Sequence, residues 1–92
     1  MRKTVIERIK KMETILDTAN EKLDDLEKAI AALEDYQTEI QKLEAYYISA
    51  EWKKDFALDE SGKLPADLKR GVLSEDGIHN MLERNRELLS AL

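Results

Sequence analysis

The sequence predicts an all-α protein: a long N-terminal heptad helix, then a short helix and a C-terminal helix that folds back, forming a helical bundle or a coiled-coil homodimer. Two observations carry this prediction. The first glycine is Gly62 and the only proline is Pro65, so more than half of the chain contains no strong helix breaker. Within that stretch, apolar residues recur at alternating steps of four and three, which is a helical period and not the alternation of a strand. With 92 residues, of which 42% are hydrophobic, we expect one domain over residues 1–92 with a thin core.

The long helix is predicted over residues 3–47. When Val5 is placed at heptad position d, apolar residues fill positions a and d in succession, and others at position g widen the stripe. The stripe expected to form a dimer contact consists of Ile9, Leu16, Leu23, Leu26, Ile30 and Leu33. A break near residues 18–20 would give a compact three-helix bundle instead, but the heptad passes through that point without a skip. A continuous helix of roughly 65 Å is too long for the rest of the chain to cover, so we expect a second molecule on the stripe.

Three further segments follow the long helix. A short helix is predicted over residues 50–57, with Ser49 as its N-cap. A loop and a short turn occupy residues 58–73, where Pro65 and Gly71 bracket a predicted helical turn at residues 66–70. The last helix is predicted over residues 75–91, capped by Ser74, with Leu73 packing onto Ile78 at its start.

Charge is distributed unevenly along the chain, whose net charge is -5. Residues 1–12 carry five cations against one acid, a net +4; residues 13–60 carry 14 acids against five lysines, a net -9; residues 61–92 carry five of each. The cations of the first segment are Arg2, Lys3, Arg8, Lys10 and Lys11. An antiparallel pair of long helices would set them against the acids of the other chain, Glu34, Asp35, Glu39 and Glu44, whereas a parallel pair would stack +4 on +4. The segment charges therefore predict an antiparallel homodimer. The alternative is that the basic segment binds nucleic acid or an anionic membrane surface, which we rank below dimer formation.

The sequence contains no constellation that indicates catalysis. It has no cysteine, and His79 is the only histidine, so neither a nucleophile with a base nor a set of metal ligands is expected. We therefore expect no enzyme activity, no cofactor and no metal. The longest apolar run, residues 29–33, is far too short for a membrane span or a signal-peptide core. A cytoplasmic location is expected, because the lack of cysteine suits a reducing compartment.

The segment after the long helix offers candidate contacts for a partner protein. All five aromatic residues lie between residues 36 and 56, and the loop that follows carries three cations with no acidic cluster beside them. The candidate contacts are Trp52, Lys63, Lys69 and Arg70. An aromatic corner of the core and a structural connector are the alternatives. The function expected is a non-enzymatic protein–protein interaction or regulatory protein.

The same segment resembles a known family. The residues that carry the resemblance are Tyr46, Tyr47, Trp52, Asp55 and Phe56, then residues 62–65 and 67–76. They are similar to those of small bacterial proteins, mainly from Gram-positive bacteria, that are grouped as a domain of unknown function, family four-two-nine-eight. The resemblance implies a helical cytoplasmic protein of bacteria. It brings no assigned activity and no functional residues.

Overall fold

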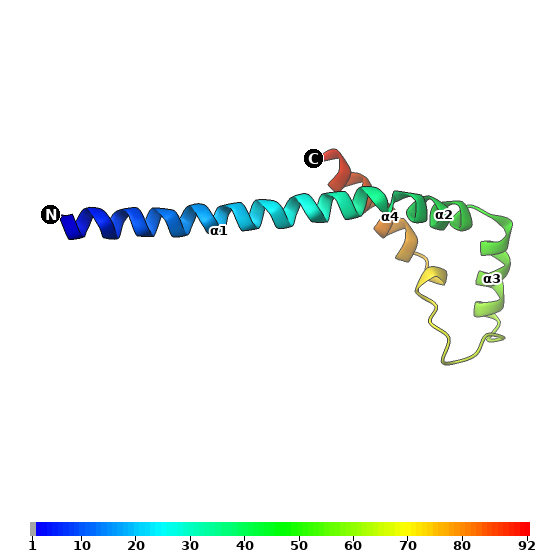
Figure 1. The fold of residues 1–92 in the computed structure, drawn as a ribbon. Helices are drawn as coiled ribbons and strands as arrows, with labels where there is room; N and C mark the ends of the chain where they lie inside the picture. The colour runs from blue at the N-terminus through cyan, green and yellow to red at the C-terminus, as the bar shows by residue number, and fades with distance from the viewer. Residues whose placement is uncertain (1) are drawn as a thin grey trace. The chain divides into compact units, whose positions relative to one another are not determined.

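The computed structural model describes residues 2–92, and they form an all-α protein (Figure 1). The helices are α1 (Arg2–Asp35), α2 (Gln37–Tyr47), α3 (Ala50–Glu60), the short 3-10 helix η1 (Gly71–Leu73) and α4 (Gly77–Ser90). Residues 2–92 contain no strand, so the predicted fold class is confirmed. The chain divides into two compact units after Tyr36.

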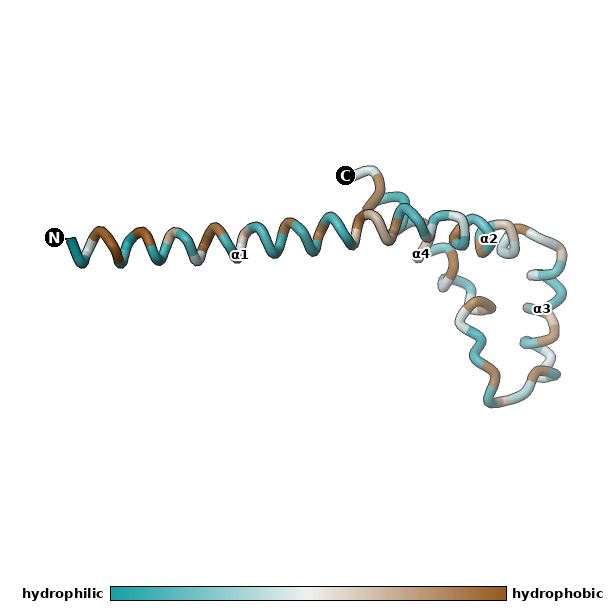
Figure 2. Tube along the Cα trace, viewed as in Figure 1, coloured by the Kyte–Doolittle hydropathy of each residue, from teal (hydrophilic) through white to brown (hydrophobic). Residues whose placement is uncertain are grey.

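The first unit is the helix α1. It contains neither Gly nor Pro, and its apolar residues recur once or twice per turn among charged ones, as the alternating brown and teal bands of Figure 2 show. No residue of α1 is buried. The helix therefore presents its apolar side without packing it into a core.

The predicted single helix over residues 3–47 is wrong at Tyr36, which separates α1 from α2. The helical hydrogen bond from the Tyr36 N–H to the Ala32 carbonyl is kept at 3.1 Å, so the interruption is confined to one residue. The side chains explain why α2 belongs to another unit. Gln37 occupies the next position of the heptad series but exchanges two amide hydrogen bonds with Asn85 of α4, at 3.0 and 2.9 Å. At the position after Leu33, the side chain of Gln37 thus contacts α4 and does not extend the exposed apolar stripe.

In the second unit, α3 has well-defined ends. The Ser49 hydroxyl accepts a hydrogen bond from the Trp52 N–H, which confirms the predicted N-cap. The helix runs three residues beyond the predicted end at residue 57, to Glu60. It then closes in a Schellman motif, in which the Lys63 N–H binds the Leu58 carbonyl at 3.1 Å and Gly62 takes the left-handed conformation with φ of 71°.

The loop and the start of α4 differ from the prediction. The short helix expected at residues 66–70 does not form. The chain makes one hydrogen-bonded turn there, in which the Leu68 N–H donates to the Pro65 carbonyl at 3.2 Å. Gly71, expected to follow that helix, is instead the first residue of η1. Helix α4 begins at Gly77 and not at residue 75, and its N-cap is Asp76, whose side chain makes no capping hydrogen bond. Ser74, predicted as the cap, lies two residues before Asp76, and its hydroxyl accepts the Gly77 N–H at 3.0 Å.

The core of the second unit is small. Its two buried apolar residues are Leu73 in η1 and Ile78 in α4, 6% and 3% exposed, the pair predicted to pack across the start of this helix. Helix α4 packs against α2 and η1, and α3 packs against η1 and α2. The C-terminal helix thus folds back as predicted, onto the α2 part of the predicted long helix.

Candidate interaction surfaces

The apolar stripe of α1 is open over most of its length. Ile9, Leu16, Leu23 and Leu26 are each between 53% and 57% exposed. The last two residues of the predicted dimer stripe, Ile30 and Leu33, are half-buried. Contiguous apolar surface of this kind marks interaction sites on soluble proteins, whereas isolated exposed apolar residues do not.

The two edges of the stripe carry opposite charges. Because α1 is uninterrupted, the heptad positions assigned from Val5 hold along the whole helix. One edge, position e, consists of Ile6, Glu13, Asn20, Glu27 and Glu34. The other edge, position g, consists of Arg8, Ile15, Lys22 and Ala29. The opposite charges of the two edges can be found in the sequence, but only when charged residues are sorted by heptad position. Charges summed over segments do not reveal them.

The basic N-terminal segment lies on the same helix, and its cations are exposed. Lys3, Lys10 and Lys11 occupy heptad positions b and c, which point away from the apolar stripe. Arg8 is at edge g and Arg2 at the start of the stripe. Most of this charge is therefore directed outward.

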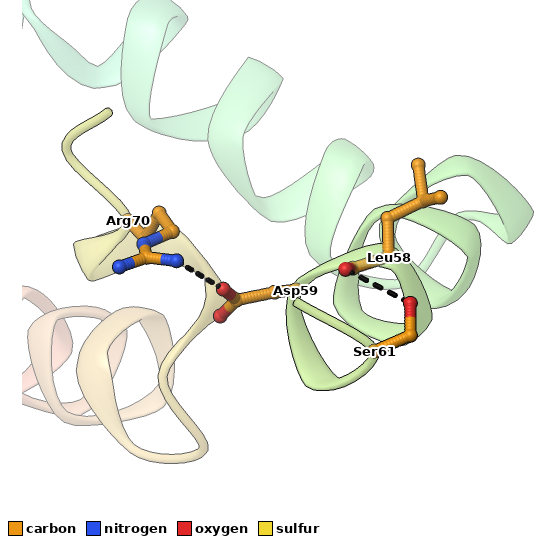
Figure 3. Close-up of polar contacts among 4 residues, drawn as sticks. All are labelled: Leu58, Asp59, Ser61 and Arg70. Carbon is orange, nitrogen blue, oxygen red and sulfur yellow. Dashed lines mark hydrogen bonds and ion pairs between the residues drawn. The ribbon is translucent and has the colours of Figure 1, made fainter. Parts of the chain in front are cut away.

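Arg70 and Trp52, two of the four predicted contact residues, make contacts within the second unit. Arg70 Nη1 donates to Asp59 Oδ1 at 2.8 Å, and the two side chains are only 35% and 25% exposed (Figure 3). This ion pair joins the loop before η1 to the last turn of α3. Trp52 Nε1 donates to the Val72 carbonyl at 2.8 Å, and its ring stacks on Phe56 with centroids 5.1 Å apart. Both residues thus stabilise the unit.

The other two predicted contacts, Lys63 and Lys69, are exposed and make no ion pair with any residue in the described range 2–92. Lys69 lies at an open groove of about 430 Å³. The groove is lined by Leu43, Lys69, Gly71, Val72, Gly77, Ile78 and Met81. Sequence reasoning missed it, because its lining comes from α2, the loop, η1 and α4, which only the fold brings together.

A polar contact fixes the corner between α2 and α3. The Tyr46 hydroxyl donates to Asp55 Oδ2 at 2.6 Å. This hydrogen bond, together with partial burial and the charge of Asp55, raises the pKa of Tyr46 to about 12. The phenol therefore stays protonated at neutral pH and serves as a hydrogen-bond donor in the structure.

Within residues 2–92, no group of three or more His, Asp or Glu side chains is arranged to hold a metal ion. His79 lies 4.0 Å from Glu83, one turn further along the same exposed helix face. In the same range, no helix combines the length and the apolar character that crossing a membrane requires.

Comparison with known proteins places most of the chain in a described family. The model of a family described as a domain of unknown function, DUF4298, matches residues 9–92. No curated protein and no solved structure matches the chain. The match covers all four α-helices, although the first only in part.

Proposed function

The chain belongs to the DUF4298 family, a domain of unknown function, and we propose from its own residues that it is a non-enzymatic protein–protein interaction or regulatory protein. The observation that carries this proposal is the open stripe of α1, where four large apolar side chains on one helix face are each more than half exposed. Keeping such a face in water costs free energy that a partner's surface would recover. The proposal includes a cytoplasmic location, which the cysteine-free composition fits.

The loop lysines provide a second contact for a partner protein. Lys63 and Lys69 form no ion pair with any side chain of residues 2–92, and Lys69 stands beside the groove formed by α2, η1 and α4. An acidic segment with an apolar side chain would match both features, because its charge would meet the ammonium groups and its apolar group would enter the groove. Arg70 supports this contact by holding the loop on Asp59.

An affinity pull-down from the native cell tests this contact. The variant Lys63→Glu/Lys69→Glu is compared with wild type and with Lys53→Glu/Lys54→Glu, which makes the same charge change on α3. We expect a partner protein to be recovered with wild type and with the α3 variant, but not with the loop variant. Equal recovery by all three would show that the loop lysines do not bind a partner.

A second candidate function is binding of nucleic acid or an anionic membrane surface by the basic segment of α1. It is favoured by the outward direction of Lys3, Lys10 and Lys11, which leaves them free when the stripe is covered. Binding to DNA, RNA or acidic vesicles should then weaken with salt and vanish when Arg2, Lys3, Arg8, Lys10 and Lys11 are neutralised. An absence of binding at low salt would remove this candidate.

A further inference from the structure

We propose that the stripe of α1 is covered by the same stripe of a second copy of this chain, and that the two helices lie parallel and in register. The inference deepens the proposed function, because it takes the stripe as an interaction surface and names its partner. It rests on the exposure of the stripe and on the opposite charges of its two edges.

The charged edges favour a second copy in parallel orientation. In a parallel pair, position g of one helix lies beside position e of the next heptad on the other helix. Arg8 then meets Glu13 of the partner subunit, and Lys22 meets Glu27 of the partner subunit. The twofold symmetry repeats each contact, so four ion pairs of opposite charge flank the apolar seam.

An antiparallel pair loses these contacts, because edge e then faces edge e and edge g faces edge g. In the antiparallel register that stacks Ile9 on Leu33, Glu13 lies beside Glu27 of the partner subunit, and the two copies of Lys22 face each other. Registers shifted by one heptad place these charges beside apolar, amide or like-charged side chains, so none forms an edge ion pair.

The proposed orientation is opposite to the one that the segment charges predict. The +4 segment owes most of its charge to Lys3, Lys10 and Lys11, and these positions point away from the partner helix. Charges at the edges of the seam are closer to the partner and less screened than outward charges, so they decide the orientation. Ile9 and Ile30 at position a, with Leu26 and Leu33 at position d, are the residue types that parallel dimers prefer there, whereas Leu16 and Leu23 at position a are not.

A double-mutant cycle on Lys22 and Glu27 tests the inference with the whole 92-residue chain. These residues lie five positions apart on opposite edges, so they do not touch within one helix. In the parallel dimer, Lys22→Glu or Glu27→Lys alone turns two attractions into repulsions, and we expect the dimer dissociation constant to rise about tenfold. Reversing both residues should restore the dissociation constant to within about threefold of wild type.

Sedimentation equilibrium gives these constants, with Lys28→Glu as the matched control, because it makes the same charge change at position f, away from the seam. We expect the control to dimerise like wild type. Helix content from circular dichroism confirms that each variant remains folded. Additive effects of the two reversals, or tighter dimers from Lys22→Glu alone, would overturn the parallel orientation. A wild-type monomer of 10.6 kDa at micromolar concentration would overturn self-pairing but would leave the proposed contact of Lys63 and Lys69 standing.

Discussion

Replacing Gly77 with alanine should destabilise the second unit, although alanine is the better helix former. A Cβ added at Gly77 would lie 2.5 Å from the Gly71 carbonyl oxygen and 2.5 Å from Ser74 Oγ. Both atoms are held in place, since Ser74 Oγ donates to the Gly71 carbonyl at 2.8 Å and accepts the Gly77 N–H at 3.0 Å. Relief of the overlap therefore requires the junction between η1 and α4 to open.

The magnitude follows from three terms. Alanine gains at most about 1 kcal/mol over glycine in a helix. Overpacking costs about 1–3 kcal/mol, and loss of the hydrogen bond from the Gly77 N–H to Ser74 Oγ costs about 1 kcal/mol. The net expectation for Gly77→Ala is a loss of about 1–3 kcal/mol in the free energy of unfolding.

Urea unfolding followed by the fluorescence of Trp52 measures this loss, because the only tryptophan lies in the second unit. Gly71→Ala is the matched control: nothing lies within 4 Å of the Cβ it would add, so its stability should stay within about 0.5 kcal/mol of wild type or rise slightly. A Gly77→Ala protein as stable as wild type would refute the close approach at this junction.

Three further contacts give measurable predictions. Tyr46→Phe should cost about 1 kcal/mol at neutral pH by removing the hydrogen bond to Asp55. The pKa of Tyr46 is about 10 in the unfolded chain and is raised to about 12 in the folded protein. The stabilisation is therefore complete below pH 10 and is lost as the pH rises toward 12. Unfolding curves of wild type and variant should converge near pH 12. Arg70→Ala and Asp59→Asn should each lower the free energy of unfolding by about 0.5–1 kcal/mol. The double variant should be little less stable than either single variant. Strictly additive losses in urea unfolding would show that the two residues do not interact. Gly62→Ala should cost about 1 kcal/mol, because alanine must adopt the φ of 71° that closes α3, and an unchanged unfolding midpoint would contradict this reasoning.

The sequence predicted the helices where local signals determine them. The heptad from Val5 to Leu33 predicted α1, and Ser49 predicted the start of α3. The division at Tyr36 was missed because no Gly or Pro marks it, and the contacts that join α2 to the second unit, such as the pairing of Gln37 with Asn85, link residues 48 positions apart. Contacts between distant residues leave no local trace in a single sequence.

The candidate contacts show the same limit. Lys63 and Lys69 could be recognised from composition and remain exposed. Arg70 was expected to be free as well, but the Schellman turn and the loop bring it to Asp59, 11 positions earlier, and this neighbour is not evident until the loop is folded. The orientation of the proposed dimer differs for another reason: segment sums treat outward and seam-facing charges alike, whereas the helix separates them.

The most direct test of the central claim is a single cysteine placed at position 9 of this cysteine-free chain. In a parallel, in-register dimer, the two copies of Ile9→Cys face each other across the seam, within the reach of a disulfide. In the antiparallel register that stacks Ile9 on Leu26, the two copies are 17 residues apart along the helix axis, or roughly 25 Å. Under mild oxidation, we predict a disulfide-linked dimer for Ile9→Cys and none for Thr14→Cys, which lies on the opposite face. A chain that stays monomeric with Ile9→Cys, at concentrations where the wild-type protein is dimeric, would contradict the parallel pairing.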